Sequence, residues 1–189
     1  MANKTANEPI HPLMAERWSP RSFSDQGITE EQVLALLQAA RWSPSCFNDQ
    51  PWRFIVGLRG RADGRHEQIM TCLTAGNRAW AGRAPLLVIA CASTRFRHND
   101  QPNRWAEYDT GAAMMSLTLQ AQALGLHVHQ MGGFDADAAR TTFGLHDDLR
   151  PMAAAAIGYI GNDISHLPDW ASERETAPRE RLVLDDLLI

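Results

Sequence analysis

"PLLVIACAS", residues 85–93, is a continuous apolar run of strand length in a chain of 189 residues. A strand with one face in water alternates apolar and polar side chains, whereas an unbroken apolar run is the pattern of a strand buried on both faces. Such a strand needs a covering layer above and below it. The run therefore predicts the centre of a sheet that is covered by helices on both sides.

A helix upstream of this run has a clear start and a clear end. Thr29 and Gln32 form the ends of a capping box, in which each side chain satisfies a free backbone N–H group at the first turn. Pro44 disfavours helical geometry in the residue before it, so the helix ends by Ser43. We expect its buried side chains to be Val33, Leu34, Leu36 and Leu37.

Helices and strands are interleaved along the rest of the chain. The other predicted helices cover residues 10–17, 67–73, 105–124 and 135–143, and Gly125 closes the longest of them. The other predicted strands cover residues 53–58, 126–131 and 152–161, whereas residues 164–178 are polar with little periodicity. The connections vary too much for every strand to be parallel, and no domain boundary is visible. We therefore expect one domain over residues 1–189.

The composition argues against several classes of function. The net charge is −4, and the chain has no block of like charges, which is not the pattern of a protein that binds nucleic acid. No apolar run approaches the ~20 residues that span a bilayer, and the N-terminal ten residues lack the apolar core of a signal peptide. The three cysteines, Cys46, Cys72 and Cys91, are widely spaced, which favours a reducing cytoplasm over a disulfide framework.

The tetrapeptide RWSP occurs twice, at residues 17–20 and 41–44, and each copy follows a predicted helix. The flanks do not match, so we reject a duplicated module. In the first copy Pro20 favours an extended Ser19, and residues two apart in an extended segment share a face. Arg17, Ser19 and Arg21 would then form a clamp for a phosphate or carboxylate. The alternative is a solvated loop with an incidental arginine pair.

The second copy opens the segment SPSCFNDQPWRF, residues 43–54. Its short polar side chains, Ser45, Asn48 and Gln50, can bond the edge of a heteroaromatic ring. Polar density between a helix and a strand is typical of binding loops on rigid elements. Taken alone, however, the segment is better explained as a polar connection that Trp52 anchors.

Five motifs in order, RWSPRSF, SPSCFNDQPWRF, ALGL…MGGFD…FGL, GYIG and PRERL, resemble the nitroreductase family of FMN-dependent oxidoreductases from about residue 10 to residue 188. The resemblance implies an α+β, three-layer α-β-α fold in which helices flank a central mixed sheet. It also implies a homodimer with shared active sites. Such an enzyme uses NADH or NADPH to reduce nitroaromatics, quinones or similar small acceptors by hydride transfer through flavin N5. A single inferred flavin, the lack of a second nucleotide motif of the G-x-G-x-x-G type and a short covering segment predict that donor and acceptor use the same flavin face in turn, by ping-pong transfer.

The resemblance further implies which residues bind FMN. Arg17, Ser19 and Arg21 match the motif for the phosphate, the ribityl chain and the pyrimidine edge, and Arg179 and Arg181 match the basic pair that completes the phosphate site. Pro44, Ser45, Cys46 and Asn48 match a loop that reaches the flavin of the other subunit. Gln130, Met131, Gly132 and Gly133 match the segment whose backbone faces N5 and O4. At Gly132 and Gly133 no β-carbon obstructs the close approach of a flat ligand. No catalytic side chain is implied, because the flavin carries the hydride chemistry.

The sequence departs from the family pattern at three places, two single residues and one segment. Cys46 stands where the family often has a serine, and Asp109 stands where relatives have a polar amide. The segment 94–105 is short, whereas relatives place helices there to cover the substrate. The acceptor pocket is therefore expected to be more open or differently built.

Three other functions are alternatives to this interpretation. One is an FMN-binding redox sensor without turnover, and another is a relative that consumes reduced flavin with oxygen. The third is a metal-dependent hydrolase built on His127 and His129, which share one face of a predicted strand. A zinc site needs three or four ligands, and no third ligand appears at a recognisable spacing.

Overall fold

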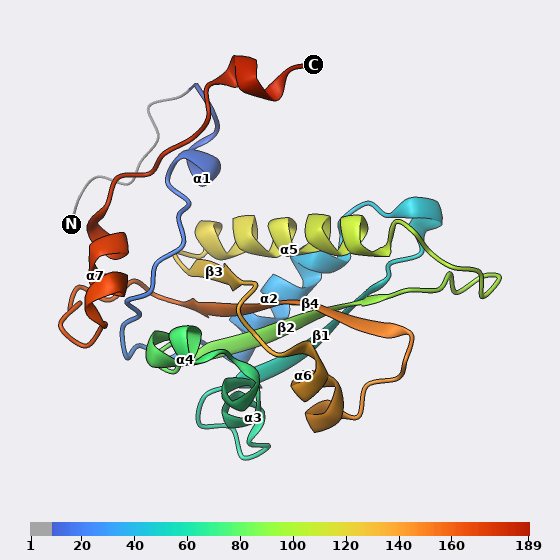
Figure 1. Ribbon diagram of the computed structural model, residues 1–189, viewed down its shortest axis with the longest axis horizontal. Coiled ribbons are helices and arrows are strands. Elements are labelled where there is room, and N and C mark those ends of the chain that lie inside the picture. Colours follow the sequence, from blue (N-terminus) through green and yellow to red (C-terminus); the bar gives the residue numbers. More distant parts are fainter. Residues whose placement is uncertain (1–8) are drawn as a thin grey trace.

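A computed structural model describes residues 9–189, and its centre is a four-stranded sheet in the order β1-β2-β4-β3 (Figure 1). The strands are β1 (Trp52–Leu58), β2 (Leu86–Ser93), β3 (His127–Met131) and β4 (Leu149–Gly158). Every pairing among them is antiparallel. The expected mixed sheet is therefore wrong, because strands that run in the same direction are never neighbours: β2 separates β1 from β4, and β4 separates β2 from β3. The α+β class with helices on both faces is confirmed.

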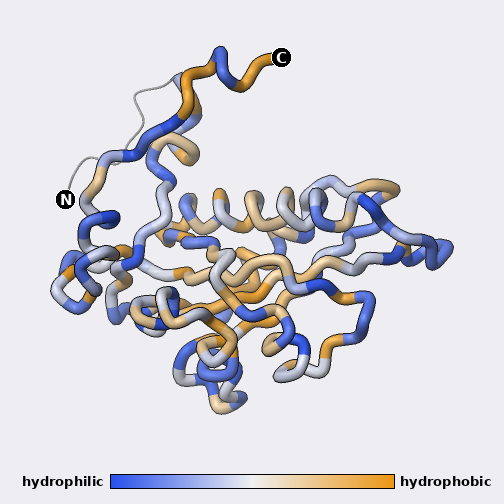
Figure 2. Tube along the Cα trace, in the orientation of Figure 1, coloured by the Kyte–Doolittle hydropathy of each residue, from blue (hydrophilic) through white to orange (hydrophobic). Residues whose placement is uncertain are grey.

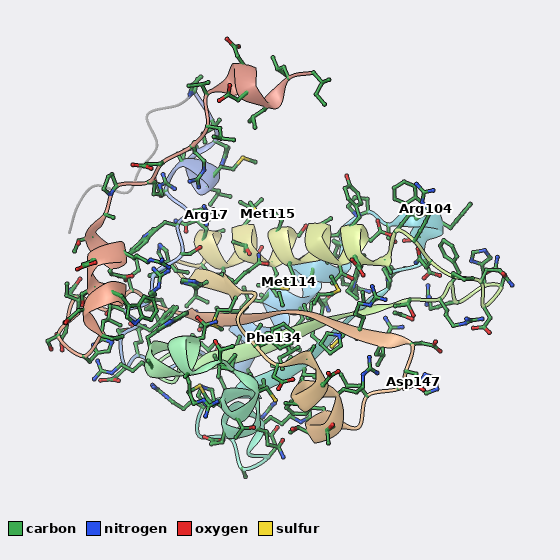
Figure 3. The ribbon with its side chains drawn as sticks, viewed as in Figure 1. Arg17, Arg104, Met114, Met115, Phe134 and Asp147 are labelled. Atoms are coloured by element: carbon green, nitrogen blue, oxygen red, sulfur yellow. The ribbon has the colours of Figure 1, made fainter. Side chains whose placement is uncertain are left out.

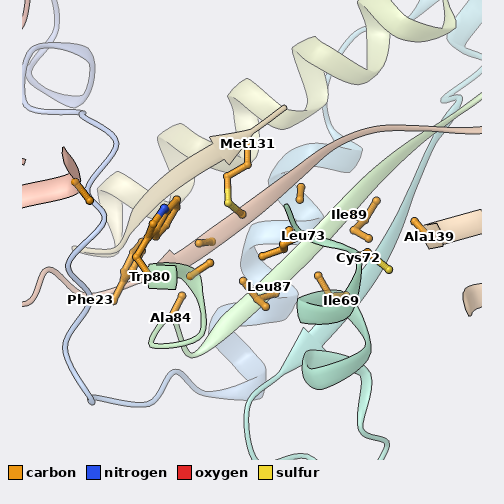
Figure 4. Packing of buried hydrophobic residues seen from close by; sticks show 14 of the residues in the cluster. Phe23, Ile69, Cys72, Leu73, Trp80, Ala84, Leu87, Ile89, Met131 and Ala139 are labelled. Carbon is orange, nitrogen blue, oxygen red and sulfur yellow. The ribbon is translucent and has the colours of Figure 1, made fainter. Parts of the chain in front are cut away.

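β2 is the central buried strand that its apolar run predicted. Its side chains alternate between two hydrophobic clusters. Leu87 and Ile89 pack with residues of α3, α4 and α6 on one face (Figure 4), and Leu86 and Val88 pack with residues of α2 and α5 on the other. Only the last residue of the strand is not fully buried.

Helices cover both faces of the sheet, as Figure 1 shows. They are α1 (Pro12–Ala15), α2 (Glu30–Arg41), α3 (Arg65–Cys72), α4 (Ala75–Ala81), α5 (Ala106–Ala123), α6 (Ala136–Phe143) and α7 (Asp169–Thr176), with 3-10 turns at Cys46–Asn48 and Leu184–Leu187. The sequence did not predict α4 and α7. Among residues 9–189, no helix has both the length and the apolar character to cross a bilayer.

The predicted ends of α2 and α5 are confirmed by their hydrogen bonds. At the start of α2, the Gln32 N–H donates to Thr29 Oγ1 at 3.2 Å, and the Thr29 N–H donates to Gln32 Oε1 at 2.9 Å. At the end of α5, Gly125 takes a φ of +73° in the left-handed region that glycine tolerates. The expectation about the buried side chains of α2 was wrong for Leu34, which is exposed, whereas Leu37 is partly buried against the core. The buried stripe of α2 passes through Val33, Leu36 and Ala40, and position 34 lies outside that stripe.

Candidate functional site

A pocket of about 210 Å³ lies between the segment after α1 and the chain at and beyond α7. Its lining is Arg17, Trp18, Ser19, Arg174, Ala177, Pro178, Arg179 and Arg181. The ion pairs formed among residues 9–189 involve none of its four arginines. Four guanidinium groups around a cavity of this size favour an anion with several oxygens.

We call this cavity, lined by Arg17, Arg174, Arg179 and Arg181, the arginine pocket. Arg179 connects the segment after α7 to the segment around α1. Its guanidinium donates hydrogen bonds to the backbone carbonyls of Arg17 and Ala15. Burial, with the neighbouring charges of Arg179 and Arg181, lowers the pKa of the Arg17 guanidinium. The three cations thus repel one another, and a bound anion would relieve that repulsion.

A buried carboxylate holds α7 against the same segment. Glu175 accepts the N–H group of Arg21 with both carboxylate oxygens, at 3.0 and 2.8 Å, and Oε1 also accepts the N–H group of Ser22 at 3.0 Å. Because Arg174 precedes Glu175 on α7, these bonds also fix the helix turn that carries one wall of the pocket.

Arg21 lies apart from the arginine pocket, contrary to the expectation that it shares a face with Arg17 and Ser19. The chain bends at Arg21, so the alternation of an extended segment stops there. Its guanidinium lies 5.7 Å from the ring of Trp170 and 6.0 Å from the ring of Trp80, which are cation–π distances. Arg17 and Ser19 do line the pocket with Arg179 and Arg181, as predicted.

β3 borders this region with two histidines. His129 Nδ1 lies 2.9 Å from the carbonyl oxygen of Pro20, and its ring lies 4.5 Å from that of Trp80. His127 lies against Trp18, with ring centroids 6.4 Å apart. Its buried Nδ1 has no hydrogen-bond partner within the described part of the chain. Burial lowers the pKa of each histidine to about 4, so both rings are neutral at pH 7.

The four residues from Gln130 to Gly133 end β3 and turn away from it. Gln130 Nε2 donates to Thr118 Oγ1 at 3.3 Å, whereas Met131 is buried in the core and offers a ligand only its backbone. A β-carbon on Gly133 would lie 2.6 Å from Asn77 Nδ2. The close contact with Asn77 therefore explains why position 133 is a glycine, without reference to a ligand. Around the equivalent position on Gly132, residues 9–189 place no atom within 4 Å. The open approach expected for a flat ligand therefore exists at Gly132 and not at Gly133.

The loop of residues 44–50 lies at the N-terminal end of α5. The Cys46 N–H donates to Asp109 Oδ2 at 3.0 Å, and the Gln50 N–H donates to Ser45 Oγ at 3.0 Å. Arg17 lies near the opposite end of the helix (Figure 3), and an 18-residue helix is about 27 Å long. Pro44, Ser45, Cys46 and Asn48 therefore do not join the arginine pocket of their own chain.

Arg174 is a pocket residue that the sequence did not single out. It lies on α7, in the polar segment that showed no periodicity. The available signal was its charge, since Arg174, Arg179 and Arg181 are three arginines within eight residues. Among residues 9–189, no three His, Cys, Asp or Glu side chains are gathered as metal ligands.

The sequence and the fold of this chain were compared with those of known proteins, and the matches agree on one family. The model of the "Nitroreductase family" matches residues 14–69 and 58–159. An uncharacterized 15.4 kDa protein of Mycolicibacterium smegmatis is 38% identical over 141 residues, which cover 71% of this chain and 92% of that protein. A Ralstonia nicotianae protein named "Putative NADH dehydrogenase/NAD(P)H nitroreductase" is 31% identical over 153 residues, covering 71% and 76% of the two chains. A crystal structure described as an oxidoreductase containing FMN has a TM-score of 0.90 and 34% identity, covering 100% of this chain and 95% of that one.

Proposed function

The chain belongs to the nitroreductase family, and from this premise we propose that it is an FMN-dependent oxidoreductase. NADH or NADPH supplies two electrons as a hydride, and small acceptors such as nitroaromatics or quinones take them up. The observation that carries the proposal is the arginine pocket, in which four guanidinium groups face a cavity without an ion-pairing carboxylate from residues 9–189.

The donor set of the pocket fits the phosphate of FMN. A phosphomonoester carries about −1.5 to −2 charges at neutral pH, together with three strong acceptor oxygens. The planar guanidinium fork binds such oxygens two at a time, and the Ser19 hydroxyl adds a neutral donor. The similar solved structure is described as containing FMN, which supports the same assignment.

When bound, FMN would supply the hydride chemistry, and the residues of this chain would bind and orient the cofactor. Arg17, Ser19, Arg179 and Arg181 would hold the phosphate, with Arg174 as a further cation. Gly132 leaves one side of the backbone open to a flat ligand.

We propose that the complete site needs two copies of the chain. The loop of residues 44–48 lies far from the arginine pocket of its own chain and would serve the cofactor of the partner subunit. The C-terminal arm, residues 182–189, supports a dimer because it extends away from the sheet and carries six apolar side chains that are each at least 61% exposed (Figures 1 and 2). Such an apolar arm is more stable when it packs against a second protein surface.

The proposed reaction is tested by rapid mixing of the FMN-loaded protein with NADH or NADPH in the absence of oxygen and acceptor. The visible flavin absorbance should fall, and a nitroaromatic or quinone added afterwards should restore it. With donor and acceptor using the same site in turn, double-reciprocal plots of steady-state rates should give parallel lines. Intersecting lines would exclude this alternation. A flavin that is not reduced on the turnover timescale would exclude the proposed oxidoreductase activity.

A further inference from the structure

The loop of residues 44–50 is fastened to a hairpin formed by residues 94–103. Arg95 and Pro102 pair across this hairpin, and the Phe96 N–H donates to the Gln101 carbonyl at 2.8 Å. Arg95 and Asp100 form a two-bond ion pair, with Nε–Oδ1 at 2.9 Å and Nη2–Oδ2 at 3.2 Å. The hairpin is therefore an ordered projection at the N-terminal end of α5 (Figure 1).

A buried aspartate joins the loop to the hairpin. The side chain of Asp49 is only 2% exposed, and its Oδ1 accepts the Arg97 N–H at 2.9 Å. Its other oxygen, Oδ2, accepts Asn103 Nδ2 at 3.4 Å. The Arg97 guanidinium in turn reaches back to the Asn48 carbonyl, with Nη2 at 3.4 Å. The loop and the hairpin thus form one surface, which we call the loop–hairpin surface.

Three aromatic rings of this surface contact one another; Phe47 and His98 are exposed, and Phe96 is partly buried. The ring centroids of Phe47 and Phe96 are 5.8 Å apart, those of Phe47 and His98 are 5.6 Å apart, and those of Phe96 and His98 are 5.3 Å apart. Phe47 is 79% exposed and has a φ of +54°, in the left-handed region that non-glycine residues avoid. An exposed phenylalanine on strained backbone is unfavourable for the isolated chain, and such strain concentrates at binding sites.

Arg97 carries an exposed positive charge on the loop–hairpin surface. Residues 44–50 and 94–103 contain two arginines, Arg95 and Arg97, and two aspartates. Asp100 is engaged by Arg95, and Asp49 is buried beneath the hairpin. The Arg97 side chain is 57% exposed, and its Nε lies 3.9 Å from Asp49 Oδ1, too far for a hydrogen bond. One nitrogen of its guanidinium, Nη2, reaches the Asn48 carbonyl, and the guanidinium keeps further N–H groups exposed beside the three rings.

We propose that the loop–hairpin surface is the acceptor subsite and that it selects aromatic acceptors that carry a carboxylate or sulfonate group. The rings of Phe47, Phe96 and His98 pack against the acceptor ring, and Arg97 pairs with its anion. The inference rests on the proposed function, in which this loop reaches the cofactor of the partner subunit. For a nitro acceptor, the nitro group takes two electrons and two protons and becomes a nitroso group. One oxygen leaves as water, and NADH or NADPH is oxidised to NAD⁺ or NADP⁺.

The test compares 4-nitrobenzoate with 4-nitrobenzamide, which have nearly the same shape and differ in charge. The holoenzyme should show a kcat/KM about tenfold higher for the carboxylate, the effect of one charge-assisted pair. Arg97→Gln keeps the backbone N–H that Asp49 accepts and should remove most of this preference, with less than about a twofold change for the amide. Arg65→Gln is the matched control, because Arg65 is exposed on α3 and distant from this surface. Equal kcat/KM values for both acceptors in the wild type would overturn the inference.

Two further measurements separate this inference from the proposed function. Calorimetric titration of the FMN-loaded protein with each acceptor should show the same carboxylate preference and its loss in Arg97→Gln, even if neither nicotinamide reduces the flavin and the proposed function fails. If the flavin is reduced and calorimetry shows no preference, only the acceptor inference fails. If Arg97→Gln raises the KM for NADPH and leaves both acceptors unchanged, Arg97 serves the donor and the inference is overturned.

Discussion

Arg179 combines two roles in one side chain, since it lines the arginine pocket and also bonds the carbonyls of Arg17 and Ala15. Its replacement by Ala should weaken FMN binding by about tenfold to a hundredfold, because a charge-assisted hydrogen bond contributes about 1.5–3 kcal/mol. Calorimetric titration of the apoprotein measures this change. Arg65→Ala, on α3, is the control and should bind FMN as the wild type does. Unchanged affinity in Arg179→Ala would remove Arg179 from the phosphate site.

His129 should make the stability of the protein depend on pH. Burial lowers its pKa to about 4 in the folded state, against 6.5 for the free side chain. The unfolded chain therefore binds a proton between these values that the folded chain does not bind, which favours unfolding. Stability is complete above pH 6.5 and falls by up to about 3 kcal/mol as the pH drops to 4.

Urea unfolding at several pH values measures this dependence. His129→Asn keeps a donor near the position of Nδ1 but does not titrate, so its stability should fall less between pH 6.5 and pH 4 than that of the wild type. A variant with the same loss of stability over this interval would show that another group is responsible.

Sequence patterns predicted some individual residues of the candidate site and missed others. The family motifs indicated that Arg17, Ser19, Arg179 and Arg181 would meet, and all four line one pocket. Arg21 could not be placed, because a bend and two distant tryptophans decide where its guanidinium lies. The need for a glycine at position 133 also comes from residues distant in sequence, because Asn77 and Thr74 leave no room there for a β-carbon.

At the scale of elements, α7 depends on the buried Glu175 carboxylate. A Gln at this position would keep one oxygen acceptor, but it would place an N–H₂ group where Oε2 accepts the Arg21 N–H, and it would remove the negative charge. We expect Glu175→Gln to lose roughly 1–3 kcal/mol of stability, or about 3–10 °C in Tm. Its FMN affinity should also fall, because α7 carries Arg174. Glu173→Gln changes an exposed residue of the same helix and should leave the Tm unchanged within about 2 °C. Equal Tm values for the two variants would contradict the role of Glu175.

The turn after β3 gives a second matched pair of variants. Gly133→Ala would force apart the Thr74 and Asn77 side chains, both of which donate to the Gly133 carbonyl, and should cost about 1–3 kcal/mol of stability. Gly132→Ala adds a methyl group to open space and should keep the wild-type Tm while weakening FMN binding. Thermal unfolding with and without FMN measures both effects. A loss of Tm in Gly132→Ala, or unchanged FMN affinity in that variant, would contradict this assignment.

The predicted elements were those whose signals are local. The capping box of α2, the apolar run of β2 and the glycine after α5 each act within a few residues. Helices α4 and α7 were missed because long-range contacts, the burial of Trp80 and the bonds to Glu175, stabilise them. The antiparallel sheet was missed for a similar reason, since strand order is a property of the whole chain.

At the scale of the whole molecule, the C-terminal arm should hold two copies together. Deletion of residues 182–189 removes six exposed apolar side chains and should convert a dimer at micromolar concentration into monomers, as measured by sedimentation. The charge control is Asp185→Asn with Asp186→Asn, which keeps the apolar side chains and should remain dimeric. A full-length protein that binds FMN as a monomer would contradict the shared site.

The most direct test of the central claim, that the arginine pocket holds the phosphate of FMN, is a calorimetric titration of the apoprotein with FMN and with riboflavin. Riboflavin presents the same ring and ribityl chain without the phosphate. We predict one FMN per chain, bound about a hundredfold more tightly than riboflavin, because the phosphate forms charge-assisted bonds to several arginines. Equal affinities for the two flavins would contradict the assignment of the pocket, and failure to bind either flavin would contradict the proposed function as a whole.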